Sequence, residues 1–148
     1  MSVSVEENKA ICHRFFEEVL NKKDMAVLDE IVHSDFIDNN PYAPAIKRKI
    51  NEPLSGKEGL KQYFSSTKSS FSDWHFTIED IIAEGDKVVL RFVYSAIHQG
   101  EFLGIPATGK RVKFTGVYIL RLADCKIIEK WVNPDLLLMM QQIGAFPC

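Results

Sequence analysis

The spacing of the apolar residues changes near Trp74, and this change limits the possible folds more than any other feature of the sequence. Before it, apolar side chains recur every three or four residues, as they do along one face of a helix. After it, they alternate with polar residues in four runs, HFTIEDIIAE, KVVLRFVYSAIH, RVKFTGVYILRL and KIIEKWVNPD. Helices followed by consecutive strands predict an α+β fold, with the helices packed on one face of a curved antiparallel sheet.

Helices are predicted over residues 4–21, 24–31 and 55–71. The first and third begin with the capping-box pattern S-x-x-E, and the second begins with an aspartate, a preferred N-cap residue. The segment HSDFIDNNPYAP, which follows the second helix, is predicted to be a loop because Pro41 and Pro44 disfavour regular structure.

The chain has 148 residues, 46% of them hydrophobic, which is enough for one core, so we expect a single domain over residues 1–148. The formal net charge of -2, with both signs scattered along the chain, argues against a nucleic-acid partner. Neither a bilayer-spanning apolar run nor a signal-peptide pattern is present, so we expect a cytoplasmic protein without membrane association. Cys12, Cys125 and Cys148 are odd in number and widely spaced, which favours reduced thiols.

The segment GIPATGKR, residues 104–111, has the spacing of a nucleotide-binding P-loop but lacks its context. Arg111 stands where serine or threonine is required, and the following residues alternate like a strand. A P-loop binds phosphates through backbone N–H groups and the N-terminus of the helix that follows it. We therefore interpret the segment as a connection between strands in which Gly104 and Gly109 allow the chain to turn.

His98 and Asp135 are candidate catalytic residues, each with a structural alternative. His98 ends an apolar strand face, where a histidine is as consistent with a structural role as with a catalytic one. Asp135 shares the strand parity of Trp131 if no bulge intervenes. It also follows a proline and precedes the apolar run LLLMMQQIG, and this spacing favours an N-cap of a C-terminal helix.

Three further residues are candidates for binding a substrate. Asn39 can hold a carbonyl group through its amide, or it can fix its own loop as an Asx turn. Tyr118 and Trp131 lie at strand positions where aromatic side chains either line pockets or fill cores. Both alternatives remain open for all three residues.

The loop after the second long strand resembles a characteristic run of SnoaL-like polyketide cyclases, H-x-G-x-F-x-G-x-P-x-T-G-K. The matching residues are His98, Gly100, Phe102, Gly104, Pro106, Thr108, Gly109 and Lys110. The resemblance extends through DFIDNNP and IIEKWVNPD to QQIG and covers nearly all of residues 8–144. Two departures stand out: Asn39 replaces the usual histidine of the entry loop, and Cys125 replaces the usual glycine of an Asp-Gly-Lys turn.

This resemblance implies a cone-shaped fold with an internal pocket, as in ketosteroid isomerases and nuclear transport factor 2, and a homodimer that pairs through the exposed sheet face. It also implies acid/base catalysis without metal or cofactor, in which an aldol condensation closes a ring of a small hydrophobic or polyketide-like carbonyl compound. Asp135 occupies the position of the family's acid/base aspartate, and His98 would hydrogen-bond to the enolate oxygen. A non-catalytic module that binds a small molecule in the same cone is the alternative, and Asn39 favours it.

Other chemistries find less support in the sequence. The histidines and cysteines do not have metal-ligand spacing, and no G-x-S-x-G motif is present. Cys12 and His13 are neighbours on a helix, where their side chains point about 100° apart, so they cannot easily pair as nucleophile and base. An epoxide hydrolase would need aspartates bridged by an arginine, but Arg91 and Arg121 fall on the opposite strand faces from the candidate pocket residues.

Overall fold

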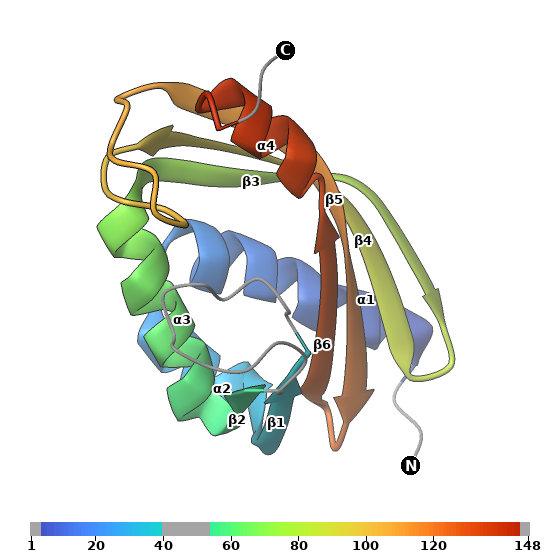
Figure 1. Ribbon diagram of the computed structural model, residues 1–148. Helices are drawn as coiled ribbons and strands as arrows, with labels where there is room; N and C mark the ends of the chain where they lie inside the picture. Colours follow the sequence, from blue (N-terminus) through green and yellow to red (C-terminus); the bar gives the residue numbers. More distant parts are fainter. Residues whose placement is uncertain (1–3, 40–53, 146–148) are drawn as a thin grey trace.

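The computed structural model describes residues 4–39 and 54–145 and has the predicted α+β architecture (Figure 1). The helices are α1 (Val5–Arg14), the π-helix η1 (Phe15–Asn21), α2 (Met25–Ile31), α3 (Gly56–Ser70) and α4 (Leu136–Gln142). The strands are β1 (Val32–Asp38), β2 (Leu54–Ser55), β3 (Phe71–Glu84), β4 (Lys87–His98), β5 (Arg111–Ala123) and β6 (Lys126–Pro134).

The strands form one six-stranded sheet with the order β2-β1-β6-β5-β4-β3. Strands β3 to β6 are consecutive antiparallel neighbours, as predicted, whereas β1 runs parallel to β6. The sheet bends around α1, η1 and α3, so these helices lie inside a cone whose wall is the sheet (Figure 1). The inward side chains of β4 and β5 are buried in strict alternation, which confirms the period of two read from the sequence.

The predicted helix caps are present at the first two helices. The hydroxyl of Ser4 accepts a hydrogen bond from the Glu7 N–H, and the Glu7 carboxylate accepts one from the Ser4 N–H. Asp24 caps α2 through the N–H groups of its first turn. The first helix changes to π geometry at η1, which the sequence did not predict, and the C=O of Leu20 there accepts a 2.7 Å hydrogen bond from the indole of Trp74.

The predicted loop from residue 33 onward is wrong in its first part, because residues up to Asp38 belong to β1. This strand pairs with β6, and its contact Asp38 to Lys130 joins residues 92 positions apart. Pairing with a strand so distant in the sequence leaves no periodic pattern of apolar residues near β1. The nearby prolines also favoured the prediction of a loop. The remainder of the predicted loop, residues 40–44, lies outside the described residues.

The turns between strands confirm the predicted turn residues. Gly85 has a φ of 58°, and Asp124 and Cys125, which form the turn between β5 and β6, have φ values of 53° and 61°. Cys125 therefore adopts the left-handed conformation, which glycine adopts at lower cost. Residues 104–110 belong to the connection between β4 and β5, as predicted, and both glycines there have positive φ, whereas Arg111 is the first residue of β5.

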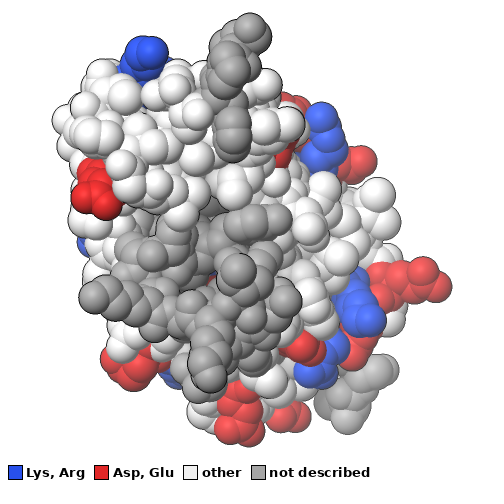
Figure 2. All heavy atoms as spheres, viewed as in Figure 1, with Lys and Arg blue, Asp and Glu red and all other residues white. Residues whose placement is uncertain are grey.

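The surface in the view of Figure 2 carries lysines and arginines next to aspartates and glutamates, rather than areas of a single sign. Among the residues that the structure describes, no helix has the length and apolar character required to cross a membrane.

Candidate functional site

A cavity of about 100 Å³ lies inside the cone, between α3 and the concave face of the sheet. Its wall is mostly aromatic and aliphatic. The lining residues are Leu20, Tyr63, Phe64, Ser66, Thr67, Ser70, Phe71, Trp74, Phe76, Phe92, Tyr94, Phe102, Phe114, Tyr118, Val132, Pro134, Leu136 and Met139. A volume of this size holds several water molecules or one small organic molecule. The cavity is therefore a candidate binding site for an apolar ligand.

Strand alternation builds the floor of this cavity. Phe92 and Tyr94 project inward from β4, and Phe114 and Tyr118 project inward from the neighbouring β5. Between the last two lies Gly116, where an added Cβ would come within 2.4 Å of the Phe92 ring. The absence of a side chain at Gly116 is what gives the Phe92 ring its position on the floor.

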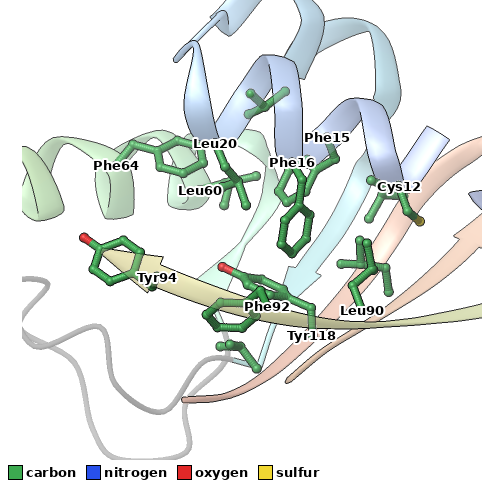
Figure 3. Close-up of a cluster of buried hydrophobic side chains, with 14 of the residues drawn as sticks. Cys12, Phe15, Phe16, Leu20, Leu60, Phe64, Leu90, Phe92, Tyr94 and Tyr118 are labelled. Atoms are coloured by element: carbon green, nitrogen blue, oxygen red, sulfur yellow. The ribbon is translucent and has the colours of Figure 1, made fainter. Parts of the chain in front are cut away.

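The phenol groups of Tyr94 and Tyr118 are the polar groups on this aromatic floor. Burial raises the pKa of both phenols well above the usual value, and the nearby tyrosines add to the effect. Both hydroxyls therefore stay neutral near pH 7 and can donate a hydrogen bond. Figure 3 shows the Tyr118 hydroxyl pointing away from Leu90 and toward the side of the core where Phe64 and Tyr94 lie.

A buried ion pair lies next to Tyr118 on the inner side of the sheet. Lys130 Nζ is 3.2 Å from Asp38 Oδ2, and both side chains have 0% exposure. The same ammonium lies 4.8 Å from the ring centre of Tyr63 and 5.0 Å from that of Tyr118. Neither charged residue was predicted from the sequence, because simple alternation along β6 would make Lys130 point outward.

A β-bulge in β6 explains this position. Arg121 pairs with Glu129 whereas Leu122 pairs with Ile127, so Ile128 is an extra residue on β6. After Ile128, the side chains of β6 point to the face opposite to the one that simple alternation predicts. Lys130 is therefore buried.

The bulge also overturns the prediction that Trp131 lines the pocket. Trp131 pairs with Ile119 on the outer side of the sheet and is not among the cavity residues, whereas Val132 and Pro134 are. The expectation that strand parity places Asp135 with Trp131 in the cavity required an unbulged strand, and that condition is not met. Tyr118 does line the cavity, as predicted.

Asp135 lies at the rim of the cavity rather than inside it. Its carboxylate is exposed and accepts a 3.1 Å hydrogen bond from the Leu138 N–H, which makes it the N-cap of α4. The structural alternative considered for Asp135 is therefore present. Its two chain neighbours, Pro134 and Leu136, line the cavity, whereas Asp135 itself is not among the lining residues.

His98 is fully buried but does not line the cavity. Its Nδ1 accepts a hydrogen bond from the Thr108 N–H at 3.3 Å and lies 3.0 Å from the Thr108 hydroxyl, so the ring holds the loop after β4. Among the described residues, Nε2 has no partner of good geometry. Burial lowers the pKa of the imidazole because it disfavours the charged form, while the nearby Gly100 carbonyl opposes this shift more weakly. Phe71, which does line the cavity, packs against the ring with 5.6 Å between centres.

The structure does not bring His98 and Asp135 together. The Asp135 N–H donates to the Thr115 C=O, and Thr115 pairs with Val93 on β4, five positions before His98. At roughly 3.3 Å per strand residue, the two backbones are about 16 Å apart along the sheet.

Asn39 stabilises the fold at the end of β1 instead of facing the cavity. Its amide nitrogen donates to Glu129 Oε2 at 3.0 Å, and its backbone N–H donates to the Lys130 C=O at 2.9 Å. Glu129 also binds Arg121 at 3.0 Å. Neither contact is the Asx turn considered for Asn39, and neither brings its amide to the cavity; both tie the end of β1 to β6.

Within the described part of the chain, histidine, cysteine, aspartate and glutamate side chains form no group of three or more that could hold a metal ion. The polar side chains that line the cavity carry phenol, aliphatic hydroxyl and indole N–H groups. The Thr67 and Ser70 hydroxyls already donate to the backbone C=O groups of Tyr63 and Glu101.

Comparisons with known proteins agree with this geometry. The family model described as SnoaL-like polyketide cyclase matches residues 10–143. Aklanonic acid methyl ester cyclase DnrD of Streptomyces peucetius is 29% identical over 117 residues, which are 78% of this chain and 76% of that protein.

Two solved structures are similar along nearly the whole chain. A candidate SnoaL-like polyketide cyclase from Jannaschia sp. CCS1 has a TM-score of 0.84 and 26% identity, with 99% of this chain and 98% of that chain covered. AclR, a candidate hydroxylase from Streptomyces galilaeus, has a TM-score of 0.79 and 27% identity, with 98% and 85% covered.

Proposed function

The chain belongs to the SnoaL-like polyketide cyclase family, and from this premise we propose that it is a cyclase-type enzyme that closes a ring in a small hydrophobic or polyketide-like carbonyl compound. The observation that carries the proposal is the aromatic cavity with the neutral phenols of Tyr94 and Tyr118 on its floor. Aromatic walls suit a flat conjugated substrate, and phenol donors suit its carbonyl oxygens.

The proposed reaction is an intramolecular aldol addition. A base removes a proton from the carbon next to one carbonyl, and the resulting enolate carbon bonds to a second carbonyl carbon of the same molecule. The oxygen of that second carbonyl becomes an alkoxide and takes a proton. One C–H and one C=O are replaced by one C–C and one O–H, so no oxidant, reductant or cofactor enters the balance.

Asp135 is the proposed acid/base group in this scheme. Its position in the chain between two cavity-lining residues, Pro134 and Leu136, supports the assignment. The carboxylate has to turn from the α4 N–H groups toward the substrate to act. The donor to the enolate oxygen is better assigned to the cavity phenols than to His98, which contacts the cavity only through the ring of Phe71.

Aklanonic acid methyl ester, the compound named for DnrD, and shorter aromatic esters that carry a second ketone within ring-closing reach of the activated carbon form a suitable test panel. The expected product has the same mass as its substrate but a different retention time, because ring closure is an isomerisation. Asp135→Asn is the matched variant, since asparagine also caps helices and should keep α4 intact. If the wild-type protein isomerises none of the panel, the cyclase proposal fails.

A non-catalytic binding module is the second candidate function. The observation that favours it is the exposure of the Asp135 carboxylate and its use as a helix cap. The fold itself does not decide between the two, because one fold can support different activities. Saturable binding of a panel member, recovered unchanged after prolonged incubation, is the result that would select the binding module.

A homodimer and a cytoplasmic location complete the proposal. Support for the dimer comes from the outer face of β4 to β6, which carries half-buried apolar side chains; these are Val89, Val93, Ile97, Val117, Ile119 and Trp131. Sedimentation velocity should give twice the chain mass, and Trp131→Lys on this face should shift the protein toward monomer. A wild-type protein that sediments as a monomer at high concentration would contradict the dimer.

A further inference from the structure

The buried pair of Lys130 and Asp38 has no part in the mechanism above, and its position calls for an explanation. Both side chains have 0% exposure, and the pair lies between the edge of the sheet and the cavity floor. Removing two charges from water is unfavourable, and an apolar pair of similar volume often stabilises a fold as well or better. A buried charge pair next to a cavity is therefore a candidate for a functional role.

The geometry connects this pair to one cavity residue in particular. Lys130 Nζ lies over the Tyr118 ring, 5.0 Å from its centre, and Tyr118 is 2% exposed on the cavity floor. The pKa of Tyr118 is raised first by burial, then by Tyr63, and then by the negative charge of Asp38. One member of the pair thus lies over the ring face, and the other opposes loss of the phenol proton.

The surrounding aromatic rings limit how Tyr118 can move. Phe16 packs edge-on at 5.0 Å between ring centres, and Phe92 packs at 5.2 Å. The Lys130 ammonium also lies over the face of the Tyr118 ring. Apolar and cationic contacts together therefore limit the orientation of this ring. Tyr94, the other phenol of the floor, packs instead against Phe76 and Phe114, at 4.8 and 5.0 Å.

We propose that Lys130 and Asp38 are positioning residues that hold the Tyr118 hydroxyl as the hydrogen-bond donor to a carbonyl oxygen in the cavity. This assignment rests on the proposed function for the idea that a carbonyl compound is bound. The ammonium over the ring face fixes the ring and draws electron density from it, which strengthens the O–H as a donor. The carboxylate keeps the proton on the phenol, so the group donates rather than accepts.

The experiment measures the carbonyl stretching frequency of acetophenone bound to the protein, by infrared difference spectroscopy with a 13C-labelled carbonyl. A hydrogen bond to the carbonyl oxygen lowers this frequency relative to an apolar solvent. We expect a lowered frequency with the wild-type protein and the loss of most of this shift in Tyr118→Phe, with a smaller loss in Tyr94→Phe. The two phenylalanine variants each remove only one hydroxyl and serve as matched controls for each other.

The pair is tested with Lys130→Met combined with Asp38→Asn, which removes both charges together. We expect acetophenone to bind within about threefold of the wild-type affinity, with at least half of the frequency shift lost. Lys130→Gln with Asp38→Asn is the second double variant, because two neutral amides can still hydrogen-bond to each other if the first variant does not fold. A merely structural pair would leave the frequency unchanged in a folded double variant.

Three results would overturn the inference: an unshifted carbonyl in the wild-type protein, a full shift in Tyr118→Phe, or a full shift in either folded double variant. If the wild-type protein shows no saturable binding of acetophenone, the inference is overturned in the same way as by an unshifted carbonyl. The proposed cyclase activity is judged separately by turnover of the ester panel. A shifted carbonyl without turnover would therefore overturn the activity and leave the positioning role standing.

Discussion

Lys130 Nζ and Asp38 Oδ2 lie 3.2 Å apart, and neither side chain is exposed to solvent. The two residues are 92 positions apart in the sequence and meet because β1 runs parallel to β6. The contact therefore joins the sheet edge to the floor of the cavity, and it is sensitive to loss of either partner.

Replacing Lys130 alone with methionine should destabilise the protein strongly. The substitution removes the ammonium that lies 3.2 Å from the buried Asp38 carboxylate, and breaking a buried pair in this way typically costs about 3–5 kcal/mol of unfolding free energy. Urea denaturation followed by circular dichroism measures the loss. The double variant Lys130→Met with Asp38→Asn should recover most of it.

The exposed ion pair of Arg111 with Asp73 provides the control for this prediction. Arg111→Met should cost less than about 1 kcal/mol, because exposed pairs contribute little. If Lys130→Met and Arg111→Met lower the unfolding free energy equally, burial does not account for the predicted cost of losing Lys130.

Asp135 should show separable effects on stability and activity. Asp135→Ala removes the cap of α4 and should cost about 1 kcal/mol of unfolding free energy, whereas Asp135→Asn should cost less because asparagine also caps helices. Both variants should reduce turnover of an identified ester substrate by about 10²–10⁴-fold if the carboxylate transfers the proton. A folded Asp135→Asn variant with unchanged turnover would remove Asp135 from the acid/base role.

Gly116→Ala tests how tightly the cavity floor is packed. The added Cβ would come within 2.4 Å of the Phe92 ring and 3.0 Å of the Pro134 Cα, so the ring has to move toward the cavity. Overpacking of this kind typically costs about 1–3 kcal/mol. We expect a lower midpoint of urea denaturation together with weaker acetophenone binding, and unchanged binding would show that the ring moves elsewhere.

His98 should contribute to the loss of stability in acid. Burial lowers its folded-state pKa below the ordinary value of 6.5, so below that value the unfolded chain binds more protons than the folded one. Unfolding free energy should therefore fall as the pH drops from 6.5 through the lower folded-state pKa, with no contribution from His98 above 6.5. Between pH 7 and pH 5, the unfolding free energy of His98→Gln should therefore fall less than that of the wild-type protein, as measured by urea denaturation at both pH values. The same fall in both proteins would contradict the prediction.

Cys12 and Cys125 should differ sharply in reactivity. Burial raises the pKa of the Cys12 thiol to about 12, so roughly one molecule in 10⁴ carries the thiolate at pH 8. Cys125 is exposed in its turn. Iodoacetamide at pH 8 should label Cys125 in the folded protein and Cys12 only after denaturation, as read by peptide mass mapping. Rapid labelling of Cys12 without denaturant would indicate frequent opening of the helical layer.

Much of the fold and part of the site could be predicted from the sequence, because the responsible signals are local. Apolar spacing indicated the four long strands and the helices, side-chain caps indicated where α1 and α2 begin, and the turn residues indicated the β-hairpins. The same reasoning rejected a P-loop at 104–111 and named Tyr118 as a candidate for lining the cavity or filling the core, and the structure shows that Tyr118 lines the cavity. Each of these features depends on interactions between residues a few positions apart.

The tertiary structure alone decided which residues share the cavity. The extra residue Ile128 reversed the faces of β6, so Lys130 is buried and Trp131 lies on the outer face, opposite to simple alternation. Pairing of β1 with a strand about 90 residues later brought Asp38 to Lys130. Strand pairing and bulges depend on partners distant in the chain, and neither leaves a periodic pattern near the residues that it moves.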